Sequence, residues 1–176
     1  YGPTVIAAAI MRIFMVYKIK NFNMMGYRIY TNNPVCGAIR GFGGVQSGFA
    51  AESHMDMLAE GIGMDPVEFR LKNATDPDTV TVNKLIISSN GLKECIQKAA
   101  LACDWKNKYG KRKDVAKGLG VAVAADVMGS KMYKAHESAG SIIKVEEDGS
   151  VYLFTGAADT GQGSDTAMAQ IAAQEL

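Results

Sequence analysis

Residues 40–46 are RGFGGVQ and residues 159–164 are DTGQGS, and each glycine-rich stretch runs directly into a helical pattern of small residues. Glycine allows positive φ angles and a close approach of the backbone to a ligand. The helix that follows presents unpaired N–H groups and the positive end of its dipole. We therefore interpret both stretches as candidate anion cradles; tight turns built on structural glycines are the alternative interpretation.

The common nucleotide-binding motifs do not match either stretch. Residues 156–161 have the spacing of a P-loop, but Gln162 stands where that motif requires a lysine. The first stretch lacks the G-x-G-x-x-G spacing of dinucleotide-binding turns, and no clean buried strand precedes it. Both the Walker and the dinucleotide-binding interpretations are therefore excluded.

Composition is that of an ordinary globular protein, with 176 residues, 48% hydrophobic content and a net charge of +1. A basic run at residues 106–113 is flanked by Asp104 and Asp114 and has no interleaved aromatic residues. This pattern favours a solvated loop over a polyanion site. We expect no nucleic-acid partner.

The sequence has three cysteines, Cys36, Cys95 and Cys103, and no two of them have the C-x-x-C spacing. With only two histidines beside them, they predict neither a disulfide framework nor a zinc or iron–sulfur site, so no metal-ligating residue is assigned. The apolar stretch 5–16 is too short to cross a bilayer and is interrupted by Arg12. No signal peptide precedes it, and we expect a cytoplasmic protein with no membrane partner.

Periodicity and turn signals predict an α+β fold with mixed helices and antiparallel strands. An Asp-Pro-Val-Glu start at residues 65–68 has the features of a helix N-terminus, and Asp148-Gly149 is a strong hairpin signal. The expected helices cover 4–17, 46–60, 66–73 and 92–102, and the expected strands cover 26–31, 118–124, 141–145 and 150–155. The chain begins at Tyr1 and ends inside a helical pattern, so we expect a piece of a longer protein.

Three stretches, residues 36–46, 51–73 and 156–173, resemble in the same order the molybdenum-binding large subunit of the xanthine dehydrogenase and aldehyde oxidase family. The resemblance implies part of a molybdopterin-binding domain. Its first segment would be 1–75, a connecting segment 76–117 and its second segment 118–176.

The same resemblance implies a hydroxylase that acts on a heteroaromatic or aldehyde carbon with oxygen derived from water. Its cofactor would be molybdopterin, in a dinucleotide form, which carries the molybdenum. Iron–sulfur clusters and FAD would lie on other domains or subunits, and a homo-oligomer is expected.

By position, the resemblance implies these cofactor-binding residues: Arg40, Gly41, Thr160, Gly161 and Gln162. Phe42 falls on the aromatic residue that packs against the bound substrate ring. Structural roles are the alternative: Phe42 would fill core, Arg40 would pair with an internal carboxylate such as Glu52, and Gln162 would cap a helix.

Ala8 stands where the purine hydroxylases of this family carry a substrate-binding arginine, although Arg12 lies one helical turn later on the same side. Purine specificity is therefore not predicted. The sequences at 31–37 and 155–159 also resemble the aryl-CoA reductase branch, and the choice between the two branches stays open.

The family's catalytic glutamate belongs to a late segment outside this chain, so no catalytic residue is assigned here. We expect the isolated chain to be folded but inactive. A third interpretation is an inactive scaffold that docks through the methionine-rich positions Met55, Met57 and Met64.

Overall fold

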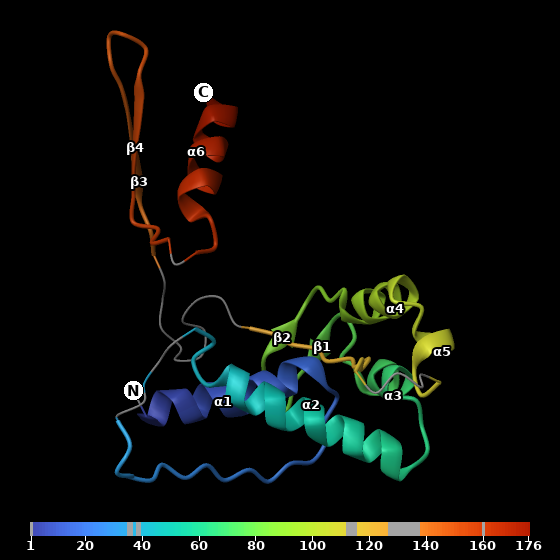
Figure 1. The fold of residues 1–176 in the computed structure, drawn as a ribbon. Helices are drawn as coiled ribbons and strands as arrows, with labels where there is room; N and C mark the ends of the chain where they lie inside the picture. The colour runs from blue at the N-terminus through green and yellow to red at the C-terminus, as the bar shows by residue number, and fades with distance from the viewer. Residues whose placement is uncertain (1, 35–36, 38–39, 112–115, 127–137, 160) are drawn as a thin grey trace. The chain divides into compact units, whose positions relative to one another are not determined.

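The computed structural model describes residues 2–34, 37, 40–111, 116–126, 138–159 and 161–176. These residues form helices and short antiparallel strand pairs, which confirms the predicted α+β class (Figure 1). The chain divides into two compact units, Tyr1–Val127 and Met128–Leu176. None of the described helices is both long and apolar enough to span a bilayer.

Two helices that pack side by side, α1 (Gly2–Val16) and α2 (Gly44–Gly61), form one part of the first unit (Figure 1). The alanine-rich sequence of α1 has high helix propensity. Helix α2 begins after Gly43, which has a φ of 91°, and Gly63, with a φ of 66°, follows its end. Positive φ is the conformation in which glycine commonly ends a helix. The predicted helices 4–17 and 46–60 are thus confirmed, with bounds shifted by one or two residues.

Helix α3 (Pro66–Asn73) begins as predicted, because the side chain of Asp65 accepts hydrogen bonds from the N–H groups of Val67 and Glu68 at 2.8 and 3.2 Å. Helix α4 (Leu92–Ala102) has its predicted bounds. A short helix, α5 (Trp105–Lys108), occupies part of the basic run that we expected to be a loop.

The core beneath these helices consists of Val67, Ile96 and Trp105. The indole of Trp105 donates to Asp65 at 2.9 Å, so the residue that caps α3 also holds α5.

The strands predicted over 26–31 and 118–124 are not formed, and both predictions are wrong for the same physical reason. A strand needs a neighbour to pair with its backbone N–H and C=O groups. Neither segment pairs with a strand in the described part of the chain. In the second segment, every other side chain from Leu119 to Val123 packs on the core, so its alternating pattern reflects one-sided burial.

Strands β1 (Thr79–Val80) and β2 (Ile86–Ile87) form a small antiparallel pair within the predicted connecting segment. They were not predicted, because two residues are too short for a periodic pattern.

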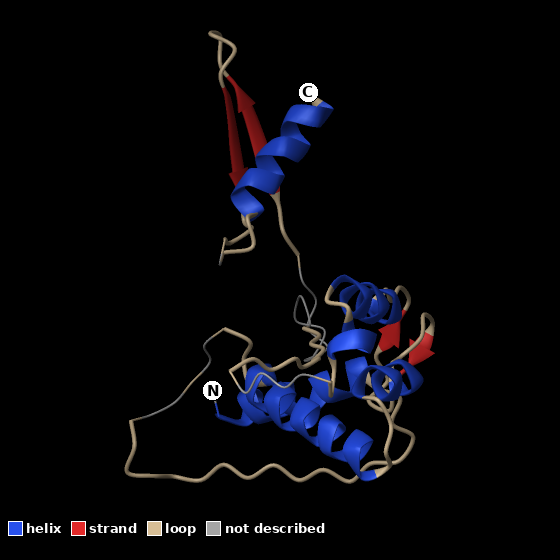
Figure 2. Cartoon of the chain, turned by 45° about the vertical axis from the view of Figure 1, so that its right-hand side comes forward, coloured by secondary structure: helices blue, strands red, loops and turns tan. Residues whose placement is uncertain are grey.

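The described residues of the second unit form a hairpin and one helix (Figure 2). Strands β3 (Ser141–Val145) and β4 (Val151–Thr155) pair antiparallel through the turn predicted at Asp148-Gly149, where Gly149 has a φ of 84°. Helix α6 (Ser164–Glu175) follows the second glycine-rich stretch. The predicted hairpin and the predicted position of this turn are both confirmed.

Candidate functional site

The first glycine-rich turn reverses the chain into α2 through three successive residues of positive φ. Gly41 has a φ of 87°, Phe42 of 44° and Gly43 of 91°. The N–H of Gly44 donates to the carbonyl of Gly41 at 2.7 Å and closes the turn. A bulky residue such as Phe42 rarely adopts this conformation, and such outliers cluster at functional sites.

Among the described residues, no side chain caps the N-terminus of α2. The first N–H groups of a helix have no partner within the helix, so they can bind an anion. Arg40, which immediately precedes the turn, is exposed. The turn therefore combines backbone donors with a nearby cation, which is the chemistry expected of an anion cradle.

Helix α1 packs unusually close to this turn. A Cβ atom added at Gly43 would lie 2.3 Å from the carbonyl oxygen of Val5, and one added at Gly44 would lie 2.2 Å from Cδ of Arg12. Gly43 is thus required by both packing and backbone conformation, and Gly44 by packing.

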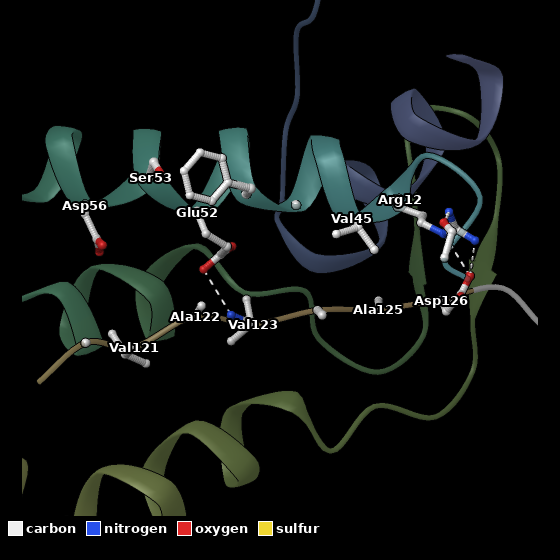
Figure 3. A pocket seen from close by; sticks show the side chains of 16 residues that line it. Arg12, Val45, Glu52, Ser53, Asp56, Val121, Ala122, Val123, Ala125 and Asp126 are labelled. Atoms are coloured by element: carbon white, nitrogen blue, oxygen red, sulfur yellow. Dashed lines mark hydrogen bonds and ion pairs between the residues drawn. The ribbon is translucent and has the colours of Figure 1, made fainter. Parts of the chain in front are cut away.

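Arg12 connects α1 to the turn and to a distant segment. Its Nη1 donates to the carbonyl of Gly41, and its Nε donates to Oδ1 of Asp126 at 2.8 Å (Figure 3). The side chain of Arg12 is only 10% exposed. Ala8, one turn earlier, is fully buried, and neither residue presents a free cation to a ligand.

A groove of about 830 Å³ lies between α2 and residues 120–126 (Figure 3). Glycine, alanine and valine residues make up most of its wall. Its charged lining residues are Arg12, Glu52, Asp56 and Asp126. The groove can therefore receive apolar groups. The charged side chains of its own lining lie on the α2 side and at the end formed by Arg12 and Asp126.

A buried polar network lies on one side of this groove and is centred on Glu52. Its carboxylate accepts hydrogen bonds from Nε of Arg70 at 2.9 Å, from the hydroxyl of Tyr17 at 2.5 Å and from the N–H of Val123 at 3.0 Å. Arg70, whose side chain is fully buried, also donates to Asp56 at 2.7 Å. The network joins the residue that follows α1 to α2, α3 and the segment opposite α2.

Burial and the Glu52 carboxylate set the ionisation of this network. Burial raises the pKa of Tyr17 well above its ordinary value, and the hydrogen bond to Glu52 raises it further. Burial alone would lower the pKa of Arg70, but its bonds to Glu52 and Asp56 outweigh that effect and raise it. The guanidinium therefore stays charged and the phenol neutral.

Sequence reasoning missed this network. The alternative pairing of Arg40 with Glu52 is wrong, since Glu52 binds Arg70 and Arg40 is exposed. One signal was present: Arg70 lies three residues after Val67 and four before Ala74, on the apolar stripe of α3. A charged residue on such a stripe requires a buried partner.

The second glycine-rich turn is organised by local hydrogen bonds. Oδ1 of Asp159 accepts from the N–H of Gly161 at 2.6 Å, and Oδ2 accepts from the N–H of Asp165 at 3.4 Å. The bond from Gly161 holds the pKa of Asp159 below its usual range. Gly163 begins α6 with a φ of 81°, as Gly43 begins α2. The N–H groups of this turn thus already face an anion, a carboxylate of the chain itself.

Gln162 donates through Nε2 to the carbonyl of Ala158 at 2.8 Å and to the hydroxyl of Ser164 at 3.3 Å. Its amide therefore lies within the turn, near the start of α6. Thr160, another predicted cofactor-binding residue, lies outside the described residues. The structure brings Arg40, Gly41 and Phe42 together at α2, and Gly161 and Gln162 together at α6.

Comparison with protein families gives two matches that share one description. A family model described as a molybdopterin cofactor-binding domain matches residues 1–74, and a second with this description matches residues 97–176. The chain belongs to the xanthine dehydrogenase and aldehyde oxidase family of molybdopterin-binding proteins. The resemblance found in the sequence is confirmed, and molybdopterin is the cofactor of the matched domains.

Several curated relatives in this family align along most or all of the chain. The xanthine dehydrogenase molybdenum-binding subunit of Escherichia coli O157:H7 is 32% identical over 180 residues, which cover 100% of this chain and 24% of that protein. A probable xanthine dehydrogenase subunit from Bacillus subtilis is 30% identical over 99% of this chain and 24% of its own length. The aldehyde oxidoreductase of Megalodesulfovibrio gigas is 34% identical, over 85% of this chain and 16% of that protein. The chain thus spans about a quarter of the length of the first two relatives.

The geometry of both turns fits a molybdopterin, which carries a phosphate group. Each turn places a helix N-terminus after a glycine of positive φ, and that glycine has no side chain with which to cap the helix. The hydrogen bonds to Asp159 show directly that the second turn accommodates negative charge.

Proposed function

We propose that the whole protein is a molybdenum-dependent oxidoreductase of the xanthine dehydrogenase type, which hydroxylates a heteroaromatic or aldehyde carbon with oxygen derived from water. The observation that carries this proposal is the first turn, where three residues of positive φ lead into a helix that no described side chain caps. When bound, the cofactor supplies a redox-active molybdenum centre.

In this proposal the residues of the first turn bind and orient. The exposed guanidinium of Arg40 and the N–H groups at the start of α2 attract the anionic part of the cofactor. Gly41 allows its close approach. The unusual backbone of Phe42 sets the direction in which its side chain leaves the turn, and its ring would pack against a flat substrate.

The second turn would supply Thr160, Gly161 and Gln162. An amide offers both a donor and an acceptor, so Gln162 is suited to a polar group of the cofactor. Its present partners are the exposed carbonyl of Ala158 and the buried hydroxyl of Ser164, and a polar group of the cofactor would replace one or both of them. The N–H of Gly161 would exchange the Asp159 carboxylate for an anionic group of the ligand.

Other parts of the proposal concern the whole protein. Residues 1–75 and 118–176 would form two molybdopterin-binding segments joined by 76–117, with the pterin in a dinucleotide form. Iron–sulfur clusters and FAD on other domains or subunits would carry electrons, in a cytoplasmic homo-oligomer. The catalytic glutamate would belong to another segment, so the 176-residue chain alone would be folded but inactive.

The groove and Arg12 support a substrate without negative charge, such as an aldehyde or a neutral heterocycle. Arg12 is already bound to Asp126 and Gly41, and Ala8 offers no cation. An aryl-CoA reductase remains the second candidate, favoured by the sequence at 31–37 and 155–159.

The test is elemental analysis for molybdenum, with pterin fluorescence, on the whole protein and on this chain purified side by side from a molybdenum-replete host. We expect both signals in the whole protein alone, and transfer of ¹⁸O from labelled water to an aromatic aldehyde. Absence of molybdenum and pterin from the whole protein would overturn the proposal and favour the scaffold interpretation. Reduction of an aryl thioester, without hydroxylation, would favour the second candidate.

A matched pair of variants tests the residue assignment. We expect Arg40→Ala to lower the pterin content of the whole protein, because it removes a cation beside the first turn. Arg28→Ala removes another exposed arginine and serves as the control. Equal pterin content in both variants would contradict a cofactor-binding role for Arg40.

A further inference from the structure

Arg12 makes a contact with the first turn that sequence reasoning did not foresee. It lies on α1, 29 residues before Gly41, yet its guanidinium donates to the Gly41 carbonyl. The same guanidinium binds Asp126, which is 114 residues away in sequence. Arg12 is largely buried, whereas the side chain of Asp126 is 58% exposed.

The Gly41 carbonyl controls the conformation of the turn. It accepts hydrogen bonds from both Arg12 and the N–H of Gly44. A peptide unit is planar, so a fixed Gly41 carbonyl also fixes the N–H of Phe42 in the opposite direction. This peptide plane lies between ψ of Gly41 and φ of Phe42, so holding it constrains both angles, including the φ of 44° at Phe42 that is disfavoured for a bulky residue. The two donors therefore hold a backbone conformation that would otherwise relax.

Asp126 is needed because it neutralises the charge of Arg12. A buried guanidinium is unfavourable without a hydrogen-bonded counter-ion, and Asp126 supplies one. The position of Asp126 is itself constrained, because the segment before it packs on the core through Val121 and Val123. The N–H of Val123 also donates to Glu52.

We infer that Arg12, neutralised by Asp126, is a positioning residue that holds the first glycine-rich turn in its cofactor-binding conformation. Arginine suits this role because its planar fork binds two groups at once, which a lysine ammonium on a flexible stem does not reproduce. The effect on the cofactor rests on the proposed function. The effect on the turn rests only on the contacts of Arg12 with Gly41 and Asp126.

The experiment measures backbone hydrogen exchange over residues 41–47 in the whole protein, with molybdenum and pterin content measured on the same samples. We expect Arg12→Gln to raise exchange of the hydrogen-bonded amides in this stretch, those of Gly44 and Ser47, about tenfold relative to α3 and to lower pterin content, since a hydrogen bond from a charged donor is lost. Arg28→Gln, an exposed arginine in the same unit, should change neither quantity.

Two further variants separate positioning from general stability. Arg70→Gln should lower the melting temperature without selectively raising exchange at 41–47, because Arg70 has no contact with the turn among its described partners. Arg12→Lys should keep much of the stability through Asp126 but still show fast exchange in the turn. If lysine restores slow exchange, Arg12 acts through charge alone and the inference is overturned.

If Arg12→Gln fails to fold, Asp126→Asn provides the test, because Asp126 is exposed and its loss should raise exchange at 41–47 by weakening the hold on Arg12. Unchanged exchange in Asp126→Asn and in any folded Arg12 variant overturns the inference. A wild-type protein without molybdenum overturns the proposed function instead, and the exchange measurement still decides the role of Arg12.

Discussion

Gly43 and Gly163 begin α2 and α6 in the same way, with φ angles of 91° and 81°, but their surroundings differ. A Cβ atom at Gly43 would collide with Val5, whereas one at Gly163 would meet nothing within 4 Å among the described residues. The first turn is held by a neighbouring helix and the buried side chain of Arg12. The second is held by hydrogen bonds within its own few residues. A shared glycine pattern thus indicates a shared backbone shape, not a shared source of rigidity.

The largest expected contrast comes from the carboxylates Glu52 and Glu146. Glu52→Ala should lower the free energy of unfolding of the first unit by about 3–5 kcal/mol, because it deprives a fully buried Arg70 of its main partner. Glu146→Ala removes an exposed ion pair with Lys144 in the second unit and should cost under about 1 kcal/mol. Urea unfolding followed by tryptophan fluorescence measures the first effect, and circular dichroism the second. Similar losses in both variants would contradict the contrast.

A smaller contrast is expected when each helix-initiating glycine is replaced. Gly43→Ala should cost about 2–5 kcal/mol, since it combines an unfavourable φ with a steric overlap at Val5. Gly163→Ala meets the conformational penalty alone, about 1–2 kcal/mol. Thermal unfolding of the two variants compares them directly. The comparison fails if Gly163→Ala is the more damaging substitution.

The smallest effect concerns pH and the second turn. The folded-state pKa of Asp159 is lowered, so its contribution to stability is present above the unfolded value of about 3.9 and is lost as pH falls through the lowered folded value. We expect the amide resonance of Gly161 to shift over that acidic range. The amide of Gly44 binds a carbonyl, which does not titrate, and should shift much less.

Asp159→Asn is the control for this measurement. Asparagine can still accept a hydrogen bond from Gly161, so the turn should persist while its titration disappears. A titration that survives in Asp159→Asn would assign the pH effect to another group.

The features that sequence predicted well are those decided by neighbouring residues. The Asp65 cap, the bounds of α4 and the Asp148-Gly149 hairpin each depend on a few adjacent positions. The left-handed glycines of the two turns also followed from local composition. Local rules of backbone sterics and hydrogen bonding are sufficient for such elements.

The features that sequence missed depend on partners far along the chain. Nothing near Arg12 indicates Asp126, and nothing near Glu52 indicates Arg70. The alternation over 118–124 was recognised, but burial on one face and pairing in a sheet produce the same period of two. Separating them requires knowing which segment lies alongside, and this information is tertiary.

The close packing of Gly44 against Arg12 also bears on how this protein can evolve. Because a Cβ at position 44 would occupy the space of the Arg12 side chain, a substitution at either position changes what the other tolerates. Alanine at 44 should be harmful beside arginine but acceptable beside a shorter residue at 12. The two positions should therefore show strong epistasis. In a library randomised at both positions, the stable variants should combine a larger residue at 44 with a shorter residue at 12, and the residue preferred at one position should depend on the residue at the other.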